Sequence, residues 1–282
     1  MGKEYGLREY GAMMADGVRM SAYRAALERA VRPGSVVVDL GAGIGIMSLI
    51  ACQLGARRVY AIEPNDNIEI ARELAAANGF GERIQIIQKS SDRVSLPELA
   101  DVLVADLRGI LPLYARHIPT LADARQRFLR PDGVLIPETD DLYVTVVSTE
   151  KGYGDSRRPW RDGAPGLDMA RAERVTVNQL ARIKLAPSDV VTPPRRWASI
   201  DYRSVTSGSV RGEVTWTVER AAVGHGLRIW FDTTLGPGIG FGNGPADPET
   251  IYGAVFLPWS ETEMSKSIDP PGVSPPSGKM WR

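Results

Sequence analysis

The stretch VVVDLGAGIG at residues 36–45 decides the fold of the first half of this chain. Its opening apolar run is short and unbroken, which suits a β-strand that is buried on both faces. Gly41, Gly43 and Gly45 follow at alternate positions. Glycines in such a turn let the backbone bend sharply and approach a ligand, because no Cβ stands in the way. A helical pattern over residues 46–54 comes next, so the stretch predicts a strand, a tight turn and a helix.

The same alternation extends outward from this stretch in both directions. Residues 19–31 carry apolar side chains at helical spacing, and Pro33-Gly34 ends that pattern. We expect further strands at residues 59–63, 84–88, 102–105 and 133–136, and further helices at 67–78 and 121–129. Strands that alternate with helices at this spacing imply a parallel sheet with right-handed crossovers.

The pattern changes at about residue 141. From there the segments are rich in β-branched and aromatic residues with partial period-two alternation, and Gly, Pro and Ser clusters separate them. This half is expected to form an antiparallel sandwich or barrel. The predicted fold class is α/β, with the following division: a nucleotide-binding domain at residues 1–138, a β-rich substrate domain at 139–266 and a Pro- and Gly-rich tail at 267–282.

Composition limits the partners and the compartment. The 34 basic and 34 acidic side chains leave a net charge near zero, which argues against nucleic acid or an anionic membrane as a partner. The single cysteine, Cys52, excludes an internal disulfide and fits a reducing compartment. One cysteine and two histidines cannot build a zinc cluster, and the N-terminus lacks the apolar core of a signal peptide. We expect a cytoplasmic protein with no metal site.

The glycine turn also indicates the kind of cofactor. The dinucleotide pattern G-x-G-x-x-G would require a third glycine at position 46, which is Ile46, whereas G-x-G-x-G is intact and Asp39 precedes it. S-adenosylmethionine carries a sulfonium and an ammonium but no phosphate. A carboxylate such as Asp39 suits that positive end better than a phosphate cradle would.

A second acidic residue supports a nucleoside cofactor. Glu63 lies at the end of the next expected strand, about twenty residues beyond the glycine turn, where a carboxylate accepts hydrogen bonds from ribose hydroxyls. The alternative is that the glycines only form a tight turn and that Glu63 is a solvated strand end. The ordered succession of strand, acid, turn, helix, strand and acid favours the cofactor.

At this point the residues resemble the protein arginine methyltransferase family, over most of the chain. The segment DGVRMSAY at residues 16–23 is similar to that family's D-x-V-R-x-x-x-Y element. The resemblance implies a Rossmann-like S-adenosylmethionine-binding domain followed by a β-barrel-like domain. It also implies that Arg19 holds the methionyl carboxylate of the cofactor, for which a bidentate guanidinium pair is suited.

Two further segments carry the resemblance. IIQKSSDRVSLP at residues 86–97 is similar to the family segment whose acid binds the adenine amino group, which implies that role for Asp92 with Ser91 beside it. FLRPDGVLIPETDDLYVTVV at residues 128–147 follows the family's exit from the nucleotide domain into its barrel.

The departures from the family concern the acceptor. The family's active-site loop has two glutamates that clamp a guanidinium group, and here the loop reads ADLRGILPLYA at residues 105–115. Asp106 and Ala115 stand at the two glutamate positions, and Arg108 adds a positive charge. The family's Thr-His-Trp loop is Thr-Ile-Tyr at residues 250–252. Because a buried cation needs compensating negative charge, we expect that protein arginine is not the acceptor.

The loop nevertheless offers candidate catalytic groups. Asp106 follows a strand and is a candidate base, acceptor-orienting group or cofactor contact; its alternative is a turn or capping carboxylate. Arg108 could bind an acceptor carboxylate or phosphate, or be a solvated loop arginine. His117 could act as a base, or be a surface helix histidine.

Three functions stay open. The first is a methyltransferase acting on a nitrogen, oxygen or carbon nucleophile of a small molecule or peptide. The second is a genuine arginine methyltransferase with an altered clamp, and the third is a catalytically inactive cofactor-binding interaction protein. The family's dimerisation arm has a counterpart in residues 155–185, so the resemblance implies a homodimer.

Overall fold

The computed structural model describes residues 5–177, 179–183, 185–217 and 222–259. The chain divides into two compact units. The first contains residues 1–140 together with two later segments, 200–210 and 232–241; the second contains the remaining residues. The expected boundary at 138/139 falls close to the end of the first long segment, but no local sequence pattern indicates that later segments join the first unit.

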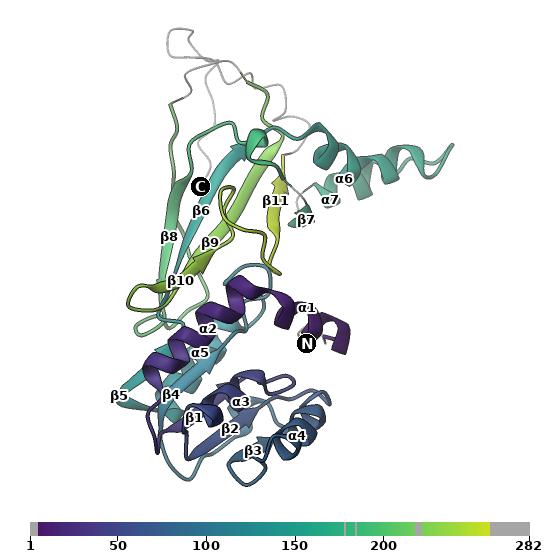
Figure 1. Cartoon of the computed structure of the whole chain (residues 1–282). Helices are drawn as coiled ribbons and strands as arrows, with labels where there is room; N and C mark the ends of the chain where they lie inside the picture. Colours follow the sequence, from purple (N-terminus) through teal and green to yellow (C-terminus); the bar gives the residue numbers. More distant parts are fainter. Residues whose placement is uncertain (1–4, 178, 184, 218–221, 260–282) are drawn as a thin grey trace. The chain divides into compact units, whose positions relative to one another are not determined.

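The first unit is built on a five-stranded sheet with the order β3-β2-β1-β4-β5 (Figure 1). All its neighbouring strands are parallel. The strands are β1 (Val36–Leu40), β2 (Arg58–Ile62), β3 (Ile84–Ile87), β4 (Ala100–Ala105) and β5 (Leu129–Ile136). Every residue of β1 is buried, as its unbroken apolar run predicts for a central strand covered on both faces. The predicted parallel sheet is confirmed.

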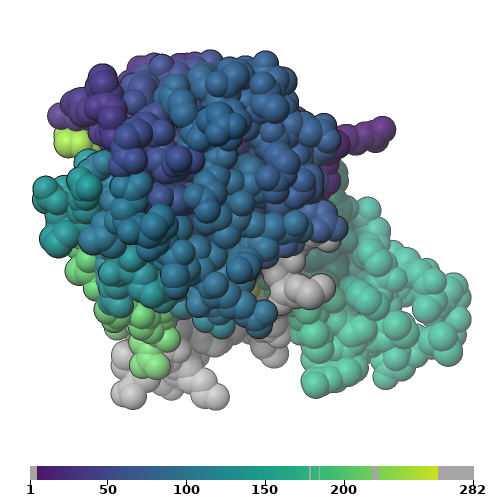
Figure 2. Space-filling model, turned by 90° about the horizontal axis from the view of Figure 1, so that it is seen from below, coloured from purple at the N-terminus to yellow at the C-terminus, as the bar shows by residue number. Residues whose placement is uncertain are grey.

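Helices connect these strands and precede them. They are α1 (Leu7–Ala15), α2 (Gly17–Ala30), α3 (Ile46–Gln53), α4 (Ile68–Ala77), a short 3-10 helix η1 (Ser91–Arg93) and α5 (His117–Phe128). α1 was not predicted; it has no buried residue, and its sequence lacks a clear apolar face. In the space-filling view, the purple and blue residues of this unit lie together on one face (Figure 2).

The later part of the chain supplies a six-stranded sheet with the order β7-β11-β9-β6-β8, in which β10 pairs with β9. Its strands are β6 (Thr139–Val147), β7 (Ala181–Ile183), β8 (Arg195–Asp201), β9 (Gly226–Gly236), β10 (Ile239–Gly242) and β11 (Ala254–Pro258). β11 pairs antiparallel with both β7 and β9. This agrees with the predicted β-rich half, while the proposed tail at 267–282 lies outside the described residues.

Within the second unit, residues 150–176 form a helical pair, α6 (Glu150–Asp162) and α7 (Ala170–Thr176). Arg157 is buried and joins the helices by ion pairing with Glu173, to which Arg161 also binds at 2.8 Å. The pair projects from the strands of its own unit (Figure 1). A short 3-10 helix, η2 (Pro187–Asp189), follows β7. Among the described residues, no helix is long and apolar enough to cross a membrane.

Candidate active site

The strand order places a ligand site at one edge of the first sheet. The chain runs outward from β1 to β2 and β3 and then returns to β4 on the other side of β1. In open α/β sheets, ligands bind beyond the carboxyl ends of the strands at such a reversal. Asp39 and the glycine turn lie at this end of β1, Glu63 follows β2, and Asp106 follows β4. The sheet therefore brings together residues that the sequence separates.

The glycine turn is closely covered by the N-terminal helix. Gly43 has a φ of +53°, in the left-handed region that side chains disfavour. A Cβ on Gly43 would lie 2.4 Å from the aromatic ring of Tyr10, which α1 brings over the turn. Only glycine allows this close approach, so the packing of α1 against the turn depends on the glycine at position 43.

The Glu63 carboxylate faces this turn. It is buried, and its two oxygens accept hydrogen bonds from the backbone N–H of Gly43 at 3.2 Å and of Asn65 at 3.1 Å. A carboxylate held at the end of β2 beside a turn without side chains fits a nucleoside whose hydroxyl groups need acceptors. The alternative of a solvated strand end is wrong.

Asp39 also has a structural role within the first unit. Its Oδ2 accepts hydrogen bonds from the backbone N–H of Ser48 at 2.9 Å and from the Ser48 hydroxyl at 2.7 Å. Burial raises the pKa of Asp39 to about 6, and the nearby Glu63 carboxylate adds to this rise. These bonds tie β1 to the first turns of α3, which orients the glycine turn between them.

Ser91 and Asp92 form the η1 turn beyond β3. Ser91 is buried, and its carbonyl accepts a hydrogen bond from Arg127 at 2.6 Å. Asp92 is exposed, and a hydrogen bond from Ser90 lowers its pKa, so it is ionised. The structure thus places an anchored residue beside an accessible carboxylate in the loop after β3.

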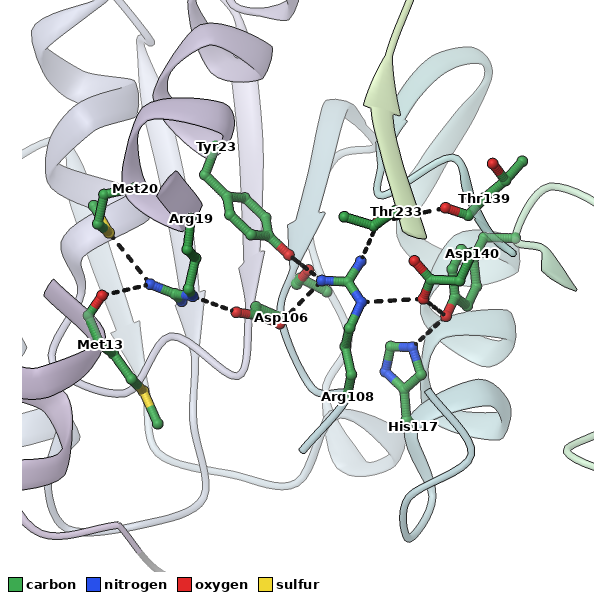
Figure 3. Close-up of polar contacts among 12 residues, drawn as sticks. Met13, Arg19, Met20, Tyr23, Asp106, Arg108, His117, Thr139, Asp140 and Thr233 are labelled. Atoms are coloured by element: carbon green, nitrogen blue, oxygen red, sulfur yellow. Dashed lines mark hydrogen bonds and ion pairs between the residues drawn. The ribbon is translucent and has the colours of Figure 1, made fainter. Parts of the chain in front are cut away.

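Arg19 lies in the first turn of α2 and reaches the end of β4. The Asp16 side chain caps that helix by accepting from the Arg19 backbone N–H at 3.0 Å. The Arg19 Nε donates to Asp106 Oδ2 at 2.7 Å, and a terminal nitrogen donates to the Met13 carbonyl at 3.2 Å (Figure 3). Two residues 87 positions apart thus form one ion pair.

Arg108 is fully enclosed, with 0% of its side chain exposed. Its nitrogens donate to Asp140 Oδ2 at 3.0 Å, to the Tyr23 hydroxyl at 2.8 Å and to Thr233 Oγ1 at 2.9 Å, and one pairs with Asp106 Oδ1 at 3.2 Å (Figure 3). The alternative of a solvated loop arginine is wrong. Arg108 therefore forms ion pairs with two carboxylates of the protein itself, Asp106 and Asp140.

The network continues to His117. The Tyr202 hydroxyl donates to Asp140 Oδ2 at 2.5 Å and lies 2.8 Å from His117 Nε2. His117 is buried, which lowers its pKa to about 3, and the nearby positive charge of Arg108 adds to this effect. The alternative of a surface histidine is wrong. His117 remains neutral, and its low pKa makes it a poor proton acceptor near neutral pH.

Sequence reasoning missed part of this network. Asp140, Tyr202 and Thr233 are separated from Arg108 by 32 to 125 positions, and no local pattern connects them. Tyr23 belongs to the same N-terminal motif as Arg19, and that motif was the one available signal for it.

Comparisons with known proteins place the chain in a family. The family model described as ribosomal protein L11 methyltransferase (PrmA) matches residues 23–137. The chain is 31% identical over 261 residues to protein arginine N-methyltransferase 6 of Xenopus tropicalis, covering 87% of this chain and 76% of that protein. The chain belongs to the protein arginine N-methyltransferase family. The predicted S-adenosylmethionine-dependent methyltransferase is confirmed by this membership.

Other members of the family extend the likeness. The chain is 28% identical to the probable protein arginine N-methyltransferase 6 of Arabidopsis thaliana, over 92% of this chain and 62% of that protein. Among solved structures, the Trypanosoma brucei PRMT1 enzyme–prozyme heterotetrameric complex with AdoHcy superposes with a TM-score of 0.81 at 26% identity, covering 91% of this chain and 82% of that chain. Both the sheet domain and the β-rich half are thus family features.

Proposed function

We propose that this family member binds S-adenosylmethionine at the carboxyl ends of β1 and β2 and transfers its methyl group to a small molecule or peptide. The observation that carries this proposal is the buried Glu63 carboxylate beside the glycine turn. The T. brucei PRMT1 complex contains AdoHcy, which is S-adenosylmethionine without its methyl group. In this proposal Glu63 accepts hydrogen bonds from the sugar hydroxyls, Arg19 binds the methionyl carboxylate, and Asp92 with Ser91 lies at the adenine.

The cofactor supplies an electrophilic methyl group, and the protein supplies alignment. In-line displacement needs the nucleophile, the methyl carbon and the sulfur on one line, away from water. Asp106 lies at the strand reversal, and Arg19 and Arg108 fix its two oxygens. A carboxylate held in this way by two guanidinium groups can orient the groups next to it.

Cofactor uptake by matched variants tests this proposal. Calorimetric titration with S-adenosylhomocysteine should show that Glu63→Gln binds at least tenfold more weakly than the native protein, because the amide offers one acceptor where the carboxylate offers two. Glu98→Gln is the control, since Glu98 pairs with Arg57 in an exposed ion pair. Native protein that takes up no S-adenosylhomocysteine would refute the proposed function.

A second candidate is a cofactor-binding partner protein without turnover. It is favoured by one observation, namely that both oxygens of Asp106 already bind guanidinium groups of the same chain. Incubation of a cell extract with isotopically labelled S-adenosylmethionine, followed by mass spectrometry, separates the two. A labelled product that depends on the native protein supports the enzyme; bound cofactor without any product supports the partner protein.

The helical pair α6–α7 is the proposed dimerisation arm. It and the segment after it expose apolar side chains, with Leu167 70%, Val175 44% and Leu180 48% exposed. Exposed apolar side chains that recur along one short segment, here residues 167–180, support an interface. We expect light scattering to give twice the chain mass for the native protein and a single chain mass for Leu167→Glu/Val175→Glu. A native protein of single-chain mass would contradict the dimer.

A further inference from the structure

The charged side chains at the end of β4 balance one another. Arg19 and Arg108 are the two cations, and Asp106 and Asp140 are the two carboxylates. Each Asp106 oxygen has its own guanidinium partner, with Oδ2 bound to Arg19 at 2.7 Å and Oδ1 bound to Arg108 at 3.2 Å. Both Asp106 oxygens are thus paired with guanidinium groups of the same chain before an acceptor arrives at this edge of the sheet.

The side chains of His117 and Tyr202 beside these ions do not change the balance between the two positive and two negative charges. Burial lowers the pKa of His117 to about 3, and burial also raises the pKa of Tyr202 well above its ordinary value. Both side chains are therefore uncharged over the range in which proteins work. Burial raises the pKa of Asp140 as well, and a proton taken up there would only add positive charge.

Arg108 is fixed in this position by segments that come from far along the chain. Thr233 and Asp140 bind its Nη2 and Nε, and the Tyr23 hydroxyl accepts from Nη1. Asp140 is held in turn by Tyr202. Withdrawal of Arg108 to admit another cation would leave Asp140 buried without its cationic partner, which costs a protein strongly.

We propose that the methyl acceptor of this protein is an uncharged group, and that Arg108 is the specificity-determining residue that excludes guanidinium and ammonium side chains. This inference rests on the proposed function. A cation entering beside Asp106 would find Asp106 and Asp140 already paired with guanidinium groups, and it would lose its own hydration without compensation. A hydroxyl, an amide or a neutral ring nitrogen loses much less on entry.

The transfer balances for such an acceptor. A lone pair of the acceptor forms the bond to the methyl carbon, and the carbon–sulfur bond breaks with its electron pair on sulfur. The positive sulfonium becomes a neutral thioether, and a hydroxyl or amide acceptor loses its proton to water. Because such an acceptor carries no positive charge on entry, the site needs no second carboxylate to compensate it.

Two probes of the same shape test the proposal. Nα-acetyl-arginine amide and Nα-acetyl-citrulline amide differ mainly in the charge of the side-chain end. Dissociation constants are measured by calorimetry or ligand-observed NMR with the protein saturated with S-adenosylhomocysteine. The native protein is expected to bind the citrulline compound at least as tightly as the arginine compound. In Arg108→Met/Asp140→Asn, Asp106 loses one of its two cationic partners. The ratio of the two dissociation constants should then change at least tenfold in favour of the arginine compound.

The controls separate the outcomes. Arg57→Met/Glu98→Gln removes an exposed ion pair of the same unit and should leave the preference unchanged. If the double variant at 108 and 140 does not take up S-adenosylhomocysteine, Arg108→Gln replaces it, because an amide retains a donor for Asp140.

A tenfold native preference for the arginine compound overturns the inference. An unchanged preference in the variant also overturns it, as does a failure of both proteins to bind either probe. Native protein that takes up no S-adenosylhomocysteine instead refutes the proposed function itself.

Discussion

Removal of the Arg108 guanidinium should destabilise the first unit strongly. In Arg108→Met the side-chain volume is roughly kept, but Asp140, which has a fully buried side chain, loses its cationic partner. Breaking a buried ion pair from one side costs about 3–5 kcal/mol. Asp140→Asn breaks the same pair from the other side and should cost a similar amount, because the buried Arg108 then loses the carboxylate that binds it at 3.0 Å.

The double variant should recover much of this loss. Removing both charges leaves neither ion unpaired, so we expect Arg108→Met/Asp140→Asn to be more stable than the sum of the single variants by about 3 kcal/mol. The exposed pair of Arg57 and Glu98, with an N–O distance of 2.7 Å, is the matched control. A double-mutant cycle on that pair should give a much smaller coupling free energy, because solvent screens both side chains.

The assay must report on the first unit. The sequence has no tryptophan before Trp160, so tryptophan fluorescence would report mainly on the second unit. Native-state hydrogen exchange of peptides covering β1 and β4, followed by mass spectrometry, gives the opening free energy of the central strands directly. A coupling between positions 108 and 140 no larger than the coupling between 57 and 98 would refute the reasoning.

Two other changes probe the turn and the pH dependence. Gly43→Ala should destabilise the protein and weaken S-adenosylhomocysteine binding more than Gly34→Ala does. Both glycines have positive φ, but only a Cβ at Gly43 meets the Tyr10 ring. Equal effects of the two variants in urea unfolding and calorimetry would contradict this. His117 has a pKa lowered from 6.5 to about 3, so the unfolded chain binds a proton that the folded one does not, and stability falls as pH drops below 6.5. Between pH 7 and pH 5 the native protein should lose about 2 kcal/mol more than His117→Gln; parallel stability–pH curves from hydrogen exchange would exclude this role.

Much of the first sheet could be predicted because its signals are local. An unbroken apolar run before alternating glycines dictates a central buried strand and a turn, and β1 lies where residues 36–40 predict it. The strand at 133–136 proved to begin at Leu129, since backbone pairing with β4 extends it through polar residues. Residues 155–185 showed mixed patterns, and there the Arg157–Glu173 ion pair joins two helices.

The amino-acid sequence by itself determined the alternating α/β domain, the glycine turn, the Glu63 position and the presence of an added arginine in the loop. Only the tertiary structure decided what that arginine does. Arg108 finds its partners 32, 85 and 125 positions away, and a local pattern carries no information about pairs at such separations. The charge of a buried site is the sum over every group that folding brings to it, so it is fixed only when distant segments have packed together.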